Sequence, residues 1–156
     1  MWKTGHSLIK KKMRETNALL AGEMSGHLFF ADRYFGYDDA IYASCRLLEI
    51  LATYRKGALE LIGDVPKTES TPEIRISCPE ERKSRIVEKV RDHFSEDHEV
   101  IGIDGARILF EDGWGLVRAS NTGPILVLRF EAKDRKRLEA IRKEVEASVN
   151  QFLSEI

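Results

Sequence analysis

The amino-acid sequence predicts an α/β fragment followed by an α+β domain in which an antiparallel sheet is packed by two helices. Three observations lead to this expectation. Residues 1–54 show two helical periodicities but only two short apolar runs, which are marginal as an independent sheet. Residues 55–72 are rich in polar residues and contain two prolines, as is typical of a connection between units. From residue 73 onward the predicted order is β-α-β-β-β-β-α, which is complete in itself.

Composition restricts the classes of partner. The 156 residues are 42% hydrophobic and 33% charged, with a formal net charge of -1. A chain without net positive charge has no global attraction to nucleic acid or to an anionic membrane, so we expect neither partner. No apolar stretch reaches the length of a membrane span, and Met1-Trp2-Lys3 does not open a signal peptide. We therefore expect a cytoplasmic protein in which any anion is bound by a local arrangement.

The first predicted element is a short helix in the segment TGHSLIKKKMRETN, residues 4–17. Thr4 or Ser7 is the expected cap, and Asn17 is the expected end. Its narrow apolar face consists of Leu8, Ile9 and Met13. Its lysines are expected to form a solvated face.

Two short strands and a second helix follow. Residues 18–21 and 28–30 are apolar runs typical of buried strands, with the GEMSGH loop between them. Residues 38–54 predict a helix whose first turn contains Asp38 and Asp39, where negative charge suits the helix dipole. Because adjacent helix positions do not face one another, we interpret these aspartates as solvated helix-start residues rather than metal ligands. The predicted core stripe of this helix is Ile41, Cys45, Leu48 and Ala52.

The second part has clearer periodicities. An alternating strand at 73–78 precedes a helix at 79–94. The helix begins near Pro79, and its inward face consists of Ile86, Val87, Val90 and Phe94. Four strands are expected at 99–103, 106–110, 114–120 and 125–132, with turns at Asp104-Gly105 and Asp112-Gly113 and a loop at 121–124. A last helix at 134–153 is capped by Asp134 and places Leu138, Ile141, Val145, Val149 and Phe152 in register.

The segment RASNTGP, at the end of a predicted strand, is one candidate binding site. Arg118 and Ser120 lie on the same side of the strand, because side chains alternate with period two. Asn121 and Thr122 add polar side chains, and Gly123 permits unusual backbone angles. A guanidinium group, hydroxyls and exposed amides suit a phosphate. The alternative is a polar hairpin loop whose side chains only satisfy backbone groups.

The GEMSGH loop is the second candidate. Glu23 and Ser25 can exchange hydrogen bonds with sugar hydroxyls, and His27 can act as an acid or base near neutral pH. His6 lies just before a helix, where an imidazole can meet an anion. The alternative is an ordinary polar turn with a structural histidine. The sequence contains no dinucleotide or P-loop motif, no HExxH, no nucleophile elbow and no paired cysteine ligands, so no metal site is expected.

Two groups of segments together resemble one family. KTGHSLIKKKMRETNALLAGEMSGHLFF followed by FGYDDAIYASCRLLEIL is similar to the second half of the third domain of an α-D-phosphohexomutase. GWGLVRASNTGPILVLRFEA is similar to the phosphate loop of the fourth domain. GEMSGH resembles the sugar loop of the phosphomannomutase/phosphoglucomutase branch, and phosphoglucosamine mutases more often carry Gln where Met24 stands. The implied domains are residues 1–66, the C-terminal half of domain 3; residues 67–72, a linker; and residues 73–156, domain 4.

The resemblance implies an activity as well as a fold. The family transfers phosphate between an active-site phosphoserine and a hexose phosphate, and so interconverts hexose 1-phosphate and hexose 6-phosphate. It does so through a hexose 1,6-bisphosphate and with Mg²⁺. By this resemblance Glu23 and Ser25 bind the sugar 3- and 4-hydroxyls, and His27 and His6 lie near the reacting oxygens. The non-reacting phosphate is expected to bind Arg118, Ser120, Asn121 and Thr122.

The chain also departs from the family pattern. The phosphoserine loop and the aspartate-rich Mg²⁺ loop belong to the first two domains, so we expect this chain alone to be inactive. Gly123 stands where the family commonly has Thr or Glu. The expected substrate is mannose or glucose 1- or 6-phosphate, and the sequence does not rank these sugars. A phosphoglucosamine mutase portion, or a stand-alone non-catalytic phosphosugar-binding module, remains the alternative. The truncated edge of the first unit predicts self-association.

Overall fold

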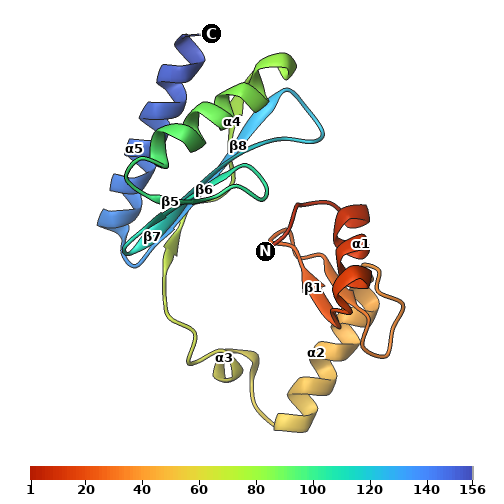
Figure 1. The fold of residues 1–156 in the computed structure, drawn as a ribbon. Helices are drawn as coiled ribbons and strands as arrows, with labels where there is room; N and C mark the ends of the chain where they lie inside the picture. The colour runs from red at the N-terminus through yellow and green to blue at the C-terminus, as the bar shows by residue number, and fades with distance from the viewer. Residues whose placement is uncertain (156) are drawn as a thin grey trace. The chain divides into compact units, whose positions relative to one another are not determined.

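The computed structural model describes residues 1–155. The chain divides into two compact units, an N-terminal unit from Met1 to Pro66 and a C-terminal unit that begins at Lys67. Figure 1 shows the helices and strands of each unit. Within residues 1–155, no helix combines the length and the apolarity needed to cross a membrane.

The N-terminal unit opens with α1, His6–Thr16. The helix ends at Asn17, as predicted, because Asn17 adopts the left-handed conformation with φ 53°. The expected cap at Thr4 or Ser7 is wrong. Gly5 occupies the N-cap position, and no side chain caps the helix. Of the predicted apolar face, Ile9 and Met13 are buried, whereas Leu8 is 39% exposed.

The next two strands pair with each other. β1, Leu20–Gly22, and β2, Leu28–Phe30, are antiparallel, with Leu20 opposite Phe30. β1 begins two residues later than the sequence predicted, and β2 has the predicted bounds. Phe29 is fully buried and forms the small core of this unit with Ile9 and Met13. The hairpin therefore packs on α1 through a single aromatic side chain.

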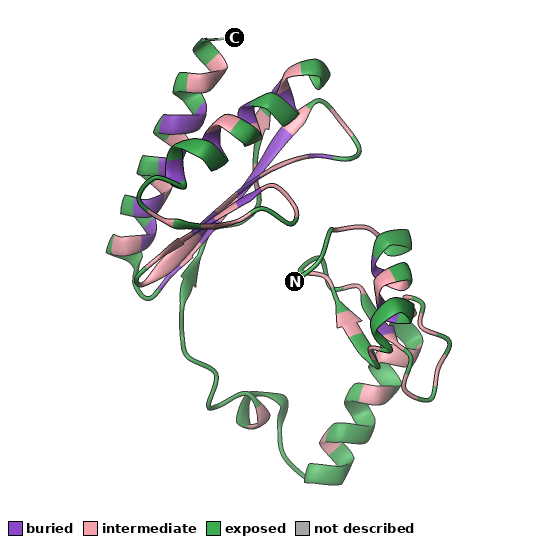
Figure 2. Ribbon diagram, in the orientation of Figure 1, coloured by how far each residue is buried: buried purple, intermediate pink, exposed green. Residues whose placement is uncertain are grey.

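The second helix, α2, spans Ala40–Tyr54, and α3 is a single turn at Ala58–Leu61. The predicted core stripe of α2 is wrong for this structure, since none of its residues is buried. Ile41 is 80% exposed and Leu48 is 64% exposed. Figure 2 shows α2 almost entirely as exposed surface. The apolar periodicity is real, but no element among residues 1–155 packs against that face.

The C-terminal unit contains one antiparallel sheet with the strand order β3-β8-β7-β6-β5, and β4 also pairs with β8. The strands are β3, Glu69–Ser70; β4, Ile74–Ser77; β5, Glu99–Ile101; β6, Ala106–Phe110; β7, Gly113–Ala119; and β8, Ile125–Ala132. The helices are α4, Glu80–Phe94, and α5, Arg135–Ser154. Both helices lie on the same face of the sheet (Figure 1). The α/β and α+β fold class predicted from the sequence is confirmed.

The core of this unit lies between the sheet and the two helices. The inward positions of α4 and α5 were predicted correctly. The fully or nearly buried ones are Ile86, Val90, Phe94, Leu138, Ile141, Val145 and Val149, and Val87 and Phe152 pack against them half-buried. Asp134 caps α5 by accepting a hydrogen bond from the Arg137 N–H at 2.9 Å. The strand β3 lies within the segment expected as a linker, and it pairs with β8.

The hairpin turn between β5 and β6 requires glycine. Gly105 has φ +95°, a conformation that residues with a Cβ atom rarely adopt. A Cβ atom there would lie 2.4 Å from the carbonyl oxygen of Val117. The predicted Asp104-Gly105 turn is therefore fixed both by backbone angle and by the close approach of β7.

Candidate functional site

The GEMSGH loop, residues 22–27, is the turn between β1 and β2. The Glu23 N–H donates to the His27 carbonyl oxygen at 2.9 Å, and the Gly26 N–H donates to the Glu23 carbonyl oxygen at 2.9 Å. Gly26 has φ +92°, which closes the turn without strain because glycine lacks a Cβ atom. The backbone thus satisfies itself, and the side chains of Glu23, Ser25 and His27 are left for other partners.

Glu23 ties this loop to the start of α1. One carboxylate oxygen, Oε1, accepts a hydrogen bond from the Gly5 N–H at 2.9 Å. The other, Oε2, accepts a longer bond of 3.3 Å from the Ser25 hydroxyl. Because Gly5 precedes His6, this contact brings the histidine at the start of α1 to the GEMSGH loop.

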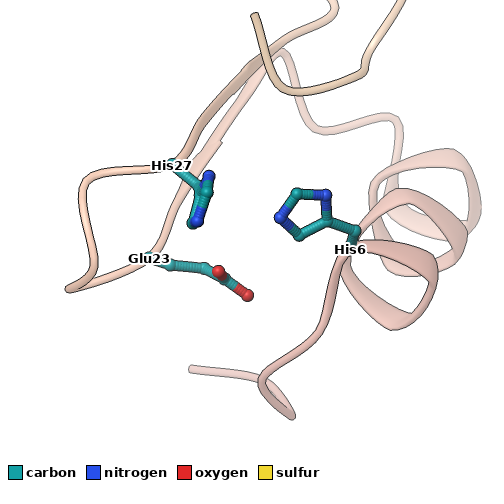
Figure 3. Close-up of side chains that lie close together, drawn as sticks. All are labelled: His6, Glu23 and His27. Carbon is teal, nitrogen blue, oxygen red and sulfur yellow. The ribbon is translucent and has the colours of Figure 1, made fainter. Parts of the chain in front are cut away.

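His6 and His27 lie side by side. Their ring centroids are 4.7 Å apart with an interplanar angle of 69°. The His6 ring also packs edge-on against Phe29 at 5.3 Å, so the small core fixes one face of it. Figure 3 shows the two rings and the Glu23 carboxylate directed toward the same space. The structure therefore brings together His6, Glu23 and His27, three of the four site residues predicted in the N-terminal unit. The fourth, Ser25, donates a hydrogen bond to Glu23.

Asp38 also belongs to this group, contrary to the interpretation from the sequence. The helix begins at Ala40, and Asp38 instead forms a bridge to Phe29 in β2. Its Oδ2 lies 2.6 Å from His27 Nδ1 and 3.9 Å from His6 Nε2. Its Oδ1 accepts a hydrogen bond of 3.3 Å from the Leu28 N–H. The interpretation of Asp38 as a solvated helix-start residue is wrong, because the chain turns back at this point and its side chain is only 21% exposed.

Asp39 plays a different and purely local part. It caps α2 by accepting a hydrogen bond from the Tyr42 N–H at 2.9 Å, which is the helix-start role predicted for it. The Tyr34 hydroxyl also donates to it, at 2.6 Å. These two hydrogen bonds, the Tyr34 bond foremost, lower the pKa of Asp39. Asp38 thus contacts His27 whereas Asp39 caps α2, and the residue types around them do not distinguish these two roles.

The second candidate, the SNTG loop, consists of Ser120–Gly123 and joins β7 to β8. The Ser120 N–H donates to the Ile125 carbonyl oxygen at 3.0 Å, and the Ile125 N–H donates to the Gly123 carbonyl oxygen at 2.9 Å. The Ser120 hydroxyl accepts a hydrogen bond of 3.2 Å from the Thr122 N–H. Ser120 is 6% exposed, so its side chain holds the turn from inside.

Several donors of this loop have no partner within residues 1–155. The Arg118 guanidinium group, near the end of β7, makes no ion pair or hydrogen bond there. The N–H groups of Asn121 and Gly123 are likewise unpaired among the described residues. A half-buried guanidinium beside free amides is the arrangement that proteins use for phosphate. The loop thus has donors that are available to an external acceptor.

Lys83, on α4, is a residue of this loop that the sequence pattern did not reveal. It is 6% exposed, and its Nζ donates to the carbonyl oxygens of Ser120 and Gly123, the latter at 3.1 Å. Its ammonium group also pairs with Glu80 Oε1 at 2.8 Å. The lysine holds both ends of the loop by their carbonyls. Its spacing of three and seven residues before Ile86 and Val90 places it on the inward face of the helix, and this spacing was the signal available in the sequence.

Comparisons with known proteins find related proteins for both units. Residues 1–68 match the family model described as "Phosphoglucomutase/phosphomannomutase, alpha/beta/alpha domain III". Residues 73–148 match the model described as "Phosphoglucomutase/phosphomannomutase, C-terminal domain". A solved structure of a phosphoglucomutase/phosphomannomutase family protein from Burkholderia thailandensis superimposes with a TM-score of 0.83. It is 45% identical, and the match covers 97% of this chain and 32% of that protein's chain.

Curated relatives give the same result. The chain is 54% identical over 143 residues to the phosphomannomutase/phosphoglucomutase of Pseudomonas aeruginosa, covering 91% of this chain and 31% of that protein. It is 49% identical over 152 residues to a phosphoglucomutase of Neisseria gonorrhoeae, covering 96% of this chain and 33% of that protein. A phosphoglucosamine mutase of Methanocaldococcus jannaschii is 31% identical over 136 residues, covering 86% and 30%.

The fold and the matches define the class as that of the hexose phosphate mutases. The chain belongs to the phosphoglucomutase/phosphomannomutase family and corresponds to its domain III and C-terminal domain. The family predicted from the sequence is therefore confirmed. The chain spans about a third of the length of the curated relatives that it matches.

Proposed function

We propose that this chain supplies the sugar-binding and distal-phosphate-binding parts of a phosphomannomutase/phosphoglucomutase. The proposed reaction interconverts mannose or glucose 1-phosphate and the corresponding 6-phosphate through a hexose 1,6-bisphosphate, in the cytoplasm. The observation that carries the proposal is the convergence of Glu23, His27 and His6 from separate segments onto one place. Carboxylates and imidazoles gathered this way suit hydroxyl recognition and proton transfer.

The residues of the N-terminal unit divide the work by chemistry. Glu23 and Ser25 bind the sugar 3- and 4-hydroxyls, since a carboxylate accepts and a hydroxyl both donates and accepts. His27 exchanges a proton with the reacting oxygen. Asp38 is bound to its Nδ1 at 2.6 Å, which leaves Nε2 for the substrate. His6 stands next to His27 and is the second candidate for this proton transfer.

The SNTG loop binds the phosphate that does not react. Arg118 supplies the charge-assisted hydrogen bonds, and Asn121 and Thr122 supply exposed polar groups beside it. The Ser120 hydroxyl accepts the Thr122 N–H and lies 3.3 Å from the Thr122 hydroxyl, and a phosphate oxygen would take its proton in place of that contact. The free energy of binding the remote phosphate orients the other end of the substrate, where the reaction takes place. Such contacts therefore raise the reaction rate.

The proposed reaction also needs a serine phosphate and Mg²⁺, and the resemblance assigns both to other domains of the family. The one group of potential metal ligands in residues 1–155 is His6, Glu23 and His27. Mg²⁺ prefers an all-oxygen octahedron, so two imidazoles do not fit it. The residues of this chain therefore contribute binding and proton transfer, and no step that passes through Mg²⁺.

A chimera tests the proposal. Residues 1–156 replace the matching third of the Pseudomonas aeruginosa relative, and mutase turnover is measured with Mg²⁺ and a hexose 1,6-bisphosphate activator. We expect turnover within about tenfold of the parent enzyme, and no turnover by residues 1–156 alone. Appreciable activity of the chain alone would contradict the proposal. A folded but inactive chimera that still binds hexose phosphate would favour a non-catalytic phosphosugar-binding module.

Within the chimera, Arg118→Ala tests the phosphate site. Loss of charge-assisted hydrogen bonds costs on the order of 2 kcal/mol, so we expect kcat/KM to fall about 30-fold. Arg135→Ala is the matched control, because Arg135 is 74% exposed on α5 and pairs with Glu139, its neighbour on the same helix. An unchanged kcat/KM in Arg118→Ala would show that the phosphate binds elsewhere.

A further inference from the structure

His6, Glu23 and His27 form a cluster with the composition of a transition-metal site. Each offers one ligand atom, and these atoms all lie within 4.8 Å of one another. They come from two segments, the start of α1 and the GEMSGH loop, whose last residue is His27, so the cluster exists only in the folded chain. Figure 3 shows the three side chains facing one another across an open space.

The ligand set indicates which ion fits. Two imidazoles and one carboxylate make up the three-residue set of many zinc sites, in which water takes the fourth position. With zinc–nitrogen bonds of 2.0–2.1 Å, tetrahedral ligand atoms are separated by about 3.3 Å. Small rotations of half-exposed side chains close the present gaps to that value. Imidazole favours zinc and its neighbours over Mg²⁺, so the site is selective against the ion that the proposed mutase reaction uses.

Asp38 supplies the outer contact that metal-binding histidines need. Its carboxylate lies 2.6 Å from His27 Nδ1, which fixes the ring and leaves Nε2 free to bind an ion. Carboxylate–histidine–zinc arrangements of this kind are common, and they also raise the basicity of the ligand. Glu23 is held in the same manner by the Gly5 N–H at 2.9 Å. Two of the three ligands are thus oriented before any ion arrives.

The charges of the cluster point the same way. Within residues 1–155, neither Glu23 nor Asp38 pairs with a lysine or an arginine. Two carboxylates therefore face two imidazoles without a neutralising cation. A divalent cation compensates this charge directly.

We propose that His6, Glu23 and His27 form a binding site for Zn²⁺, with Asp38 as the positioning residue of His27. The ion uses the same imidazoles and carboxylate that the proposed function assigns to the sugar, so Zn²⁺ and hexose phosphate exclude one another. The mutual exclusion of Zn²⁺ and hexose phosphate rests on the proposed function, whereas the binding of Zn²⁺ does not. Zn²⁺ is then an inhibitor that acts at the sugar site rather than by displacing Mg²⁺.

Zn²⁺ binding to residues 1–156 is measured by isothermal titration calorimetry at neutral pH. We expect one Zn²⁺ per chain, and no comparable binding of Mg²⁺ under the same conditions. Co²⁺ replaces Zn²⁺ as a spectroscopic probe, and visible absorption bands of four- or five-coordinate Co²⁺ are expected. In the NMR spectrum, the ring signals of His6 and His27 shift, whereas those of His93 and His98 stay in place. Absence of saturable Zn²⁺ binding overturns the proposal.

Four variants assign the ligands. His27→Ala removes a ligand and is expected to abolish stoichiometric binding, whereas Asp38→Asn is expected to weaken it about 10- to 100-fold. His93→Ala and Cys45→Ser are the matched controls, because His93 and the Cys45 thiol are exposed potential ligands outside the cluster. Both controls should bind Zn²⁺ like the parent chain. Binding that survives His27→Ala, or that is lost in either control, places the ion elsewhere and contradicts the proposal.

Two further measurements distinguish loss of the fold from loss of the metal site, and failure of the proposed function from failure of Zn²⁺ binding. The amide spectrum of each variant shows whether the fold is retained, and if His27→Ala is unfolded, then Glu23→Gln replaces it as the ligand variant. In the active chimera at saturating Mg²⁺, added hexose phosphate should relieve inhibition by Zn²⁺. Relief by extra Mg²⁺ instead overturns the exclusion of sugar by Zn²⁺. An inactive chimera with normal Zn²⁺ binding refutes the proposed function and leaves the metal site standing.

Discussion

At the scale of single residues, Lys83 shows how a buried charge can organise a binding loop. Its ammonium group contacts two carbonyl oxygens of the SNTG loop and one carboxylate, Glu80, while the residue is 6% exposed. By binding the carbonyls on one side, it leaves the amides of Asn121 and Gly123 to other partners. It also places a positive charge next to the proposed phosphate site. Lys83 is therefore a positioning residue for the proposed phosphate site.

We predict that Lys83→Met weakens this loop. Methionine keeps the apolar stem but removes the donor of the Ser120 carbonyl and one of the two donors of the Gly123 carbonyl, which costs about 2 kcal/mol in the free energy of unfolding. Inorganic phosphate should also shift the amide signals of Asn121, Thr122 and Gly123 at roughly tenfold higher concentration than in the parent chain. Lys89→Met, on the same helix but with an exposed ion pair to Glu155, is the control. Equal phosphate affinity in Lys83→Met and the parent would refute this role.

At the scale of elements, Asp112 joins the β6–β7 turn to the start of α5. Its carboxylate accepts from Lys133 Nζ at 2.7 Å and from Arg137 Nε at 2.8 Å. The Lys133 hydrogen bond, followed by the Arg137 hydrogen bond, lowers the pKa of Asp112 below its usual 3.8. The turn was predicted from Asp112-Gly113, but the role of the aspartate comes from a helix that begins more than twenty residues later.

This lowered pKa predicts a pH dependence of stability. A carboxylate with a lower pKa in the folded state stabilises the fold above the unfolded-state pKa of about 3.9. That contribution disappears as the pH falls through the lower folded-state value. Asp112→Asn should therefore be less stable than the parent chain at pH 7, and the difference should shrink toward pH 2.5. Urea unfolding at both pH values measures it.

Asp97→Asn provides the control, because Asp97 is exposed and makes no ion pair among residues 1–155. It should unfold like the parent at both pH values. A stability difference for Asp112→Asn that is the same at pH 7 and pH 2.5 would show that charge is not the cause.

At the scale of the whole molecule, the two units differ in how much of their apolar surface they cover. The C-terminal unit encloses a continuous core between its sheet and both helices. The N-terminal unit has a core of three buried residues, and its longest helix, α2, has none. The predicted stripe of α2 thus remains on the surface as an apolar face that includes Ile41 and Leu48.

We predict that residues 1–156 self-associate through this exposed face and the outer edge of β1, which pairs with no strand other than β2 among the described residues. Apolar surface and unpaired strand edges both favour contact between copies. The mass measured by light scattering should rise with protein concentration, and Ile41→Glu with Leu48→Glu should reduce the rise. Arg135→Glu, which also changes exposed charge but on α5, should not reduce it. A strict monomer at high concentration would contradict this prediction.

The sequence was most informative where periodicity and local chemistry decide the outcome. The helices α4 and α5 and the strand β8 lie close to their predicted bounds, because their apolar residues repeat with the period of the element that forms. Asn17 ends α1 and Asp134 begins α5 because cap conformations depend on the local chain. The GEMSGH and SNTG loops were likewise located from residue types and their order, and the family followed from their combination.

What only the tertiary structure decided are the contacts between segments distant in the sequence. Asp38 and Asp39 are adjacent and chemically identical, yet one binds His27 and the other caps α2. Lys83 lies 37 residues from Ser120, and no periodicity links them. The stripe of α2 was correctly recognised as apolar, but burial depends on a partner element as well as on the stripe. The sequence by itself thus determined the elements and the family, and the fold decided which side chains meet, because those contacts depend on long-range packing.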